Sequence, residues 1–195
     1  AVKTELKPYV KELNRVSEEN KFLSLRVEQL EAQSRANNLV IHGLPESTYA
    51  EASTNAEADN TQKAPSRRDT IQCILKCCNS KLGVAVSEND ISAGFRIPGI
   101  KNAPRPIVVT FTSKSIRDKV YISRKLLRKQ DGGPRIYINE HLTKGSSGLF
   151  AKGRALLREG KIASVWTLNG NVYVKRNESD RPSRISSMED LQKYQ

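Results

Sequence analysis

The spacing of hydrophobic residues changes twice along this chain. Over residues 2–30 they recur alternately every four and every three positions, which predicts the buried seam of a coiled coil. Residues 36–140 combine short strand-like runs with two stretches of helical spacing, and residues 141–195 combine helical spacing with two short strands. The pattern therefore predicts a mixed α+β protein with three parts, at residues 1–35, 36–140 and 141–195.

The first part is expected to form a parallel coiled coil through an unbroken seam. The seam consists of Val2, Leu6, Tyr9, Leu13, Val16, Asn20, Leu23, Val27 and Leu30. Pro8 predicts that the ordered helix begins near this residue, because proline has no amide proton to donate. A single helix that packs on its own domain is the alternative interpretation.

Two features bear on the number of chains in the coiled coil. Asn20 lies at an a position of the heptad, where it fixes the register and often favours a dimer. In segment 26–31 an arginine and a glutamate flank two hydrophobic residues that are separated by two positions. This order resembles a trimer-favouring pattern, in which Arg26 and Glu31 pair between helices. We expect a homotrimer, with a dimer as the alternative. The residues expected to carry this self-association are Leu13, Val16, Asn20, Leu23, Arg26, Val27, Leu30 and Glu31.

The second part predicts the order β-α-β-β-α-β, which is the split ferredoxin-like topology that includes RNA-recognition motif (RRM) domains. The expected elements are a strand at 39–41, a polar loop at 46–66, a helix from Ser66 or Asp69 to Leu82, strands at 91–97 and 105–111, a helix from Ser115 to Lys129, and a strand at 135–139. Alternation in the second strand places Phe95 on the same face as Ile91. The positions at which RRM domains carry stacking aromatic residues hold Pro106 and Val108. We therefore expect contacts to phosphates rather than base stacking on this sheet.

Charge favours a polyanionic partner. The net charge is +12, and residues 36–140 and 141–195 carry 16 and 10 basic residues against 10 and 5 acidic ones. Seven basic residues and one acid lie between Lys114 and Lys129. Helical spacing predicts that Arg117, Tyr121, Arg124 and Arg128 share one exposed face, suited to phosphates and one stacked base. The alternative is an ordinary solvated helix face.

The third part predicts a helix at 146–159, a hairpin turning at Asn169-Gly170, and a short helix capped by Ser186 and Glu189 that ends near Leu191. The hairpin places Val165, Val172 and Val174 on one face and Trp166, Tyr173 and Lys175 on the other. The sequence does not decide which face is buried. A lone tryptophan is usually a core residue, which favours burial of Trp166. The alternative is that Trp166, Tyr173 and Lys175 form an exposed platform on which bases stack.

Two resemblances follow from particular segments. The segments Arg35–Glu46, Phe95–Gly99 and Arg105–Phe111, which follow a coiled coil, resemble the first-open-reading-frame protein of LINE-type non-LTR retrotransposons. That resemblance implies a trimeric stalk, a variant RRM domain and RNA-chaperone activity, with Arg35, Arg96 and Arg105 near the RNA. The segments Val165–Thr167 and Val172–Lys175 resemble the C-terminal domain of the baculovirus few-polyhedra (FP) protein.

The sequence therefore predicts an oligomeric protein that binds single-stranded RNA, or single-stranded DNA, through phosphates and acts as a nucleic-acid chaperone in a cytoplasmic, and alternatively nuclear, ribonucleoprotein. A viral or host structural adaptor without nucleic-acid binding is the alternative. No enzyme, cofactor, metal site or membrane contact is expected, and the cysteines are expected to pack as small apolar side chains. The expected nucleic-acid contacts are Arg35, Arg96, Arg105, Arg117, Tyr121, Arg124, Lys125, Arg128, Lys129, Arg154, Arg158, Trp166, Tyr173, Lys175 and Arg176.

Overall fold

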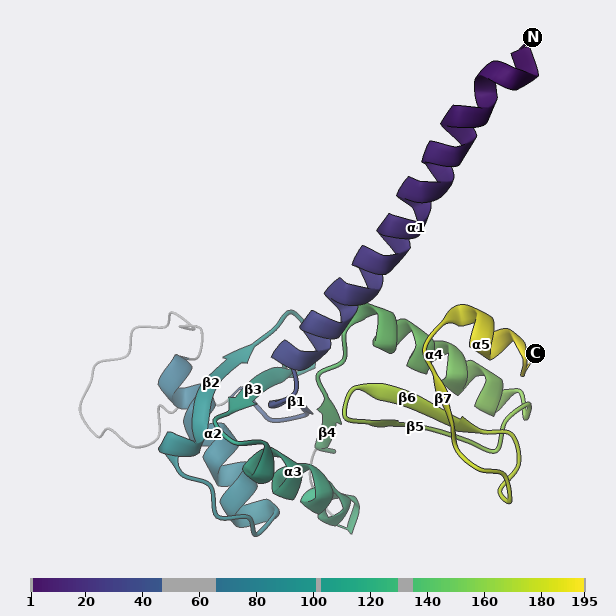
Figure 1. Ribbon diagram of the computed structural model, residues 1–195. Helices are drawn as coiled ribbons and strands as arrows, with labels where there is room; N and C mark the ends of the chain where they lie inside the picture. Colours follow the sequence, from purple (N-terminus) through teal and green to yellow (C-terminus); the bar gives the residue numbers. More distant parts are fainter. Residues whose placement is uncertain (1, 47–65, 101–102, 130–134, 195) are drawn as a thin grey trace. The chain divides into compact units, whose positions relative to one another are not determined.

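A computed structural model describes residues 2–46, 66–100, 103–129 and 135–194, and Figure 1 shows its elements. The side chains of residues 2–6, 128 and 129 are outside this description, as is most of the polar loop expected at 46–66. Contacts divide the chain into two compact units. The central unit comprises residues 36–141 and 167–169, and the stalk unit comprises residues 1–35, 142–166 and 170–195. The chain combines helices with antiparallel sheets, which confirms the predicted α+β class.

The central unit contains a four-stranded antiparallel sheet in the order β2-β3-β1-β4. Its elements along the chain are β1 (Asn38–His42), α2 (Arg67–Lys76), the π-helical turn η1 (Cys77–Lys81), η2 (Glu88–Asp90), β2 (Ile91–Arg96), β3 (Ile107–Phe111), α3 (Lys114–Ser123), the 3-10 turn η3 (Arg124–Lys129) and β4 (Tyr137–Glu140). Apolar residues of α2, α3 and the four strands form one core between the helices and one face of the sheet. That core includes Leu39, Ile74, Val109 and Val120, all fully buried.

A β-bulge in β2 changes which residues face the core. The pairing with β3 shifts between Ile91 and Ala93, so Ile91 stays buried whereas Phe95 is 49% exposed. Gly94 instead faces α2, because a Cβ there would lie 2.9 Å from Ile74 Cδ1. The prediction that Phe95 shares a face with Ile91 is therefore wrong. The extra residue of the bulge breaks the strict alternation on which that prediction rested.

Helix α3 is shorter than expected and starts at a different cap. Ser113 accepts a hydrogen bond from the Ser115 amide, so it replaces Ser115 as the capping residue. The α-helix ends at Ser123, and residues 124–129 continue as a 3-10 turn. Because the 3-10 turn has about three residues per turn, the α-helical spacing that aligned Arg128 with Arg117 no longer applies.

The stalk unit begins with one long helix, α1 (Val2–Ser34), that contains Pro8. The prediction that the helix starts near Pro8 is therefore wrong; a proline close to a helix N-terminus removes few intrahelical hydrogen bonds. At its other end α1 contacts the C-terminal part of the chain. Arg35 donates to the Leu142 carbonyl at 2.6 Å and to Glu31 at 3.1 Å, and the Thr143 hydroxyl donates to the Glu28 carboxylate.

The C-terminal part of the stalk unit packs two helices on one face of a three-stranded sheet (Figure 1). The elements are α4 (Lys144–Arg158), β5 (Ser164–Leu168), β6 (Asn171–Lys175), β7 (Ser183–Ile185) and α5 (Met188–Gln192). Asn169 and Gly170 have φ values of 51° and 76°, as the predicted two-residue turn requires. Strand β7 was not predicted, and Ser187 with Asp190, rather than Ser186 with Glu189, forms the capping box of α5.

We predict that two glycines with positive φ differ in their tolerance of alanine. Gly83 (φ 64°) has open space around it, so Gly83→Ala should lower the free energy of unfolding by about 1 kcal/mol through backbone strain alone. At Gly43 (φ 81°) a Cβ would lie 2.2 Å from the Arg135 carbonyl oxygen, so Gly43→Ala should cost clearly more than Gly83→Ala. Urea unfolding of both variants measures the difference. Equal losses would show that the Arg135 backbone moves aside without cost.

Candidate nucleic-acid interface

Arg117 does not lie on an exposed face as predicted. Its guanidinium donates to Glu140 at 2.7 Å and to Asp118 at 2.8 Å, and the side chains of Arg117 and Glu140 are 4% and 2% exposed. Glu140 also accepts a hydrogen bond from the Asn169 amide at 2.8 Å. The ion pair ties α3 to β4 inside the unit. Arg117 is therefore a structural residue, because a charge this deeply buried must keep its partner.

Tyr121 is covered by neighbouring cations. The Arg124 guanidinium carbon lies 3.6 Å from the Tyr121 ring centre, and that of Arg117 lies 4.9 Å from it. Arg124 also donates to the Tyr121 carbonyl, at 2.5 Å. The Tyr121 ring, expected to stack on a base, thus already contacts two guanidinium groups of its own unit. Lys125 is exposed, and the side chains of Arg128 and Lys129 lie outside the described residues.

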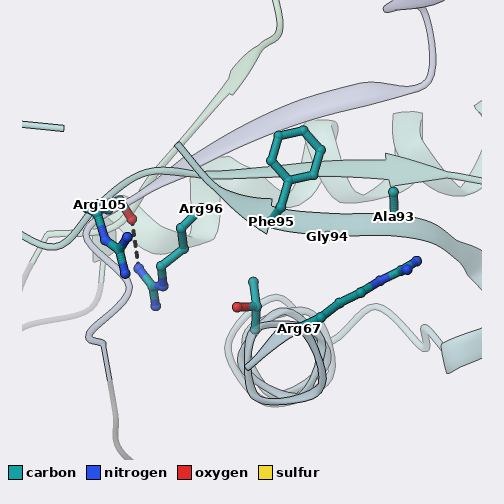
Figure 2. A pocket seen from close by; sticks show the side chains of 7 residues that line it. Arg67, Ala93, Gly94, Phe95, Arg96 and Arg105 are labelled. Atoms are coloured by element: carbon teal, nitrogen blue, oxygen red, sulfur yellow. Dashed lines mark hydrogen bonds between the residues drawn. The ribbon is translucent and has the colours of Figure 1, made fainter. Parts of the chain in front are cut away.

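Three arginines line a pocket of about 450 Å³ between the edge strand β2 and α2, with Arg96 and Arg105 side by side and Arg67 pointing away from them (Figure 2). Arg96 donates to the carbonyls of Leu44, Pro45 and Arg105 at 2.7–3.1 Å, which holds the strand ends together. Arg105 forms a two-pronged pair with Glu46, with a shortest distance of 2.8 Å. Arg67, which sequence reasoning missed, points along the same pocket and has one long contact of 3.3 Å, to the Ser92 carbonyl.

This arginine cluster carries a net positive charge, but the ion pair with Glu46 already occupies the Arg105 guanidinium. Hydrogen bonds from the Arg105 side chain and backbone lower the pKa of Glu46 to about 2, so its carboxylate stays charged at neutral pH. The guanidinium groups of Arg105 and Arg96 therefore share one carboxylate, whereas that of Arg67 points away from them along the pocket. Such an arrangement can hold an anion such as a phosphate, with Arg67 as the least engaged cation.

The sheet face opposite α2 and α3 carries two exposed aromatic residues that the sequence analysis did not select. Phe95 on β2 and Tyr137 on β4 are 49% and 51% exposed. Tyr137 was predictable, because Ile136 and Ile138 on either side of it are buried and strand residues alternate. Phe95 was not predictable, because the β-bulge has no clear sequence signal.

The basic residues of helix α4 are exposed and lack acidic neighbours on their own helix. Its fifteen residues include Lys144, Lys152, Arg154 and Arg158 but no Asp or Glu. Among the described residues none of these four takes part in a salt bridge. Helical spacing of four places Arg154 and Arg158 on one face. This face can therefore attract an anion without first breaking an internal contact.

The other residues of the stalk unit that were predicted to contact nucleic acid differ in how far contacts within the protein already occupy them. Arg35 is half-buried and engaged with Glu31 and Leu142, so it holds the chain together. Arg176 lies over the Tyr194 ring at 5.2 Å and donates to the Lys193 carbonyl. Lys175 donates to the Glu178 carbonyl at 3.1 Å. Trp166 and Tyr173 are half-buried and stack on each other, with ring centres 5.9 Å apart. Trp166 is not among the core residues, contrary to its usual role.

The seam residues of α1 face solvent in the single chain. Leu13, Val16, Leu23, Val27 and Leu30 are 40–68% exposed. Asn20 donates to the Val16 carbonyl of its own helix at 3.2 Å. In the single chain Glu31 pairs with Arg35, whereas the coiled coil would pair it with Arg26 of another chain. On α1 the contact with the C-terminal part uses Glu28, which lies off the seam and beside Gly145 of α4.

Other candidate chemistry is limited. Burial raises the pKa of Cys77 to about 11 and that of Cys78 to about 12, which keeps both thiols protonated and unreactive at neutral pH. Among the described residues no group of three or more His, Cys, Asp or Glu side chains could hold a metal ion. None of the helices in the described ranges is long and apolar enough to cross a membrane.

These observations define an α+β protein with a long N-terminal helix, antiparallel sheets and exposed basic side chains. Within it, residues 143–195 match the family described as baculovirus FP protein domain 2. The match confirms the resemblance expected for the C-terminal part. No curated protein matches the chain.

We predict that breaking the Arg117–Glu140 pair destabilises the central unit. Glu140→Ala leaves a buried guanidinium without its main partner and should lower the free energy of unfolding by about 3 kcal/mol. The double variant Arg117→Met with Glu140→Leu removes both charges and should recover most of that loss. Urea unfolding of the two variants and the parent chain provides the measurement. A loss below about 1 kcal/mol for Glu140→Ala would contradict the structural role.

Proposed function

We propose that this protein is an oligomeric, single-stranded nucleic-acid binding protein that coats RNA through phosphate contacts and acts as a nucleic-acid chaperone. The observation that carries the proposal is the set of four exposed cations on α4, which has no acidic residue and places Arg154 and Arg158 on one face. Phosphate contacts of this kind are independent of sequence and supply most non-specific affinity.

The way the protein uses its carboxylates supports the same function. Asp69 and Asp90 cap helical turns, and Glu140 pairs with the buried Arg117. These three acids therefore serve contacts within the central unit. The net charge of +12 also favours a polyanionic partner.

Self-association through α1 completes the proposal. Parallel α1 helices that bury Leu13, Val16, Leu23, Val27 and Leu30 would place several basic surfaces around one stalk. Because these surfaces are linked, many weak phosphate contacts together give a high overall affinity for RNA. Individual contacts still exchange quickly, which is what a chaperone needs to let strands rearrange. We favour a trimer, because of the pattern at residues 26–31, over a dimer.

The proposed identity is a retroelement or retroelement-derived protein related to the first-open-reading-frame protein of LINE-type retrotransposons. It is supported by the segments Arg35–Glu46 and Arg105–Phe111 and by the strand order β2-β3-β1-β4 with helices on one face, which suits an RRM-like domain. Its place would be a cytoplasmic ribonucleoprotein, with nuclear entry as the alternative.

The match of residues 143–195 favours a second candidate function. In that case the protein is a viral or host structural adaptor, and the stalk and the C-terminal part bind proteins. A filter-binding assay with random single-stranded RNA at low salt separates the two candidates, since only the first predicts retention of the RNA.

We predict that RNA affinity falls steeply with salt and depends on α4. The variant Arg154→Glu with Arg158→Glu should weaken binding and reduce the slope of log K against log salt by about 1.4, the value for two lost contacts to a single strand. Fluorescence anisotropy of a labelled RNA across a salt series measures both effects.

The matched control is Lys11→Glu with Lys21→Glu, which changes the charge equally at two exposed positions of α1. We expect this control to lose much less affinity than the α4 variant. Equal losses would mean that net charge alone acts, and a flat salt dependence would exclude the phosphate mechanism.

We predict that Leu23→Asp dissociates the oligomer, because it places a charge in the proposed seam. The neighbouring variant Phe22→Asp, at an equally exposed position off the seam, should leave the assembly intact. Sedimentation equilibrium should give three times the chain mass of 21.8 kDa for the parent protein. A monomeric parent protein would refute the coiled coil, and twice the chain mass would establish the dimer.

A further inference from the structure

The three-stranded sheet of the stalk unit has one face that the helices leave uncovered. Val172, Val174 and Ile185 point into the core formed with α4 and α5. Alternation along β6 and β7 therefore places Tyr173 and Arg184 on the opposite face. These two residues are direct register partners, so their side chains are neighbours across the two strands.

Trp166 extends this uncovered face onto β5. Its neighbour Val165 packs on the core side, where it lies 2.9 Å from the position of a Cβ on Gly153. Trp166 therefore points the other way, and its ring lies 5.9 Å from that of Tyr173 at an interplanar angle of 17°. Trp166, Tyr173 and Arg184 thus form one row across the three strands, which we call the aromatic row.

The charged residues of the three strands are of one sign. The three strands contain Lys175 and Arg184 but no Asp or Glu. Arg184 is exposed and also borders a groove beside α1, and Trp166 and Tyr173 are half-buried and stack on each other. Nearly parallel rings beside a guanidinium suit a ligand with a flat π face and a nearby negative charge.

Unpaired nucleotides have both features. A base in a single strand can stack on an exposed ring, and the phosphate next to it can pair with a guanidinium. A base inside a duplex already stacks on both sides and cannot reach the row. Since every base has a π face, such a site adds affinity for single strands without adding sequence specificity.

We propose that the aromatic row of Trp166, Tyr173 and Arg184 is a base-stacking site for single-stranded nucleic acid. The site rests on the proposed nucleic-acid binding and adds to it a contact with bases, separate from the phosphate contacts of α4. It accounts for an aromatic pair that lies on the side of the sheet away from the hydrophobic core.

The chain has a single tryptophan, so the fluorescence of Trp166 reports on this site directly. The probes are a 15-nucleotide oligo(A) RNA and an oligomer of 15 abasic sugar phosphates, both titrated into the full chain at low salt. We expect both to bind, and only oligo(A) to quench Trp166 fluorescence to saturation. Binding of both without a fluorescence change overturns the aromatic row but leaves the phosphate mechanism intact. Binding of neither overturns the proposed function and the row together.

Substitutions separate stacking from a role in folding. Trp166→Ala with Tyr173→Ala should weaken oligo(A) binding by about 10-fold or more and leave abasic-oligomer binding and the salt slope unchanged. Trp166→Phe keeps a stacking ring and should bind oligo(A) within about 3-fold of the parent chain. Phe22→Ala, which removes an exposed ring from α1, is the matched control and should have no effect.

Circular dichroism and thermal melting verify that each variant is folded. If the double alanine variant is unfolded, the decision rests on Tyr173→Ala alone and on the quenching of Trp166 in the parent chain. Equal losses of oligo(A) and abasic-oligomer affinity in a folded variant would overturn the stacking site.

Discussion

Helices cover only one face of each sheet in this protein, and the positions of its candidate binding residues follow from that. In the central unit, α2 and α3 bury Leu39, Ile74 and Val109 against one face, so Phe95 and Tyr137 are left on the other. In the stalk unit, α4 and α5 bury Val172, Val174 and Ile185, so Trp166 and Tyr173 are left outside the core. Successive strand residues point to opposite faces; on the face away from the helices the edge-strand residues Phe95 and Tyr137 are exposed, whereas Val40 and Val108 on the central strands stay buried. The aromatic residues that can meet a ligand are thus a consequence of core packing.

The second general feature is that several arginines bind carbonyl or carboxylate groups of the protein itself. Arg117, Arg96 and Arg35 were all candidates for RNA contacts, and each instead makes short contacts to carbonyl or carboxylate groups of its own unit. Burial explains this outcome most directly for Arg117, because its buried charge needs the carboxylates of Glu140 and Asp118. The cations that remain available are those on exposed helix faces, such as Arg154 and Arg158. Counting basic residues in a segment therefore overestimated the number of exposed cations on α3 and did not single out those on α4.

Helix α1 contacts the C-terminal part through one face and carries the residues of the proposed seam on another. Leu25, Glu28 and Gln29 line a groove of about 440 Å³ with Ser146, Arg184 and Met188, all within the stalk unit. The seam residues Leu23, Val27 and Leu30 lie away from that groove and face solvent. An α-helix has room for both surfaces, because positions b, c and f of a heptad point away from a and d. The contact with the C-terminal part therefore leaves the seam available for a second chain.

The sequence by itself determined the class of the protein, the place of most helices and strands, and the turn at Asn169-Gly170, because periodicity, caps and positive φ are local properties. It also identified the C-terminal part, through the segments that surround Trp166 and Tyr173. Only the tertiary structure decided that Phe95 is exposed, that Arg117 is paired with Glu140, and that Trp166 lies outside the core. A bulge, a buried ion pair and the choice of a covered sheet face depend on residues far apart in the chain. No local pattern contains that information, so these features emerge only when the elements pack together.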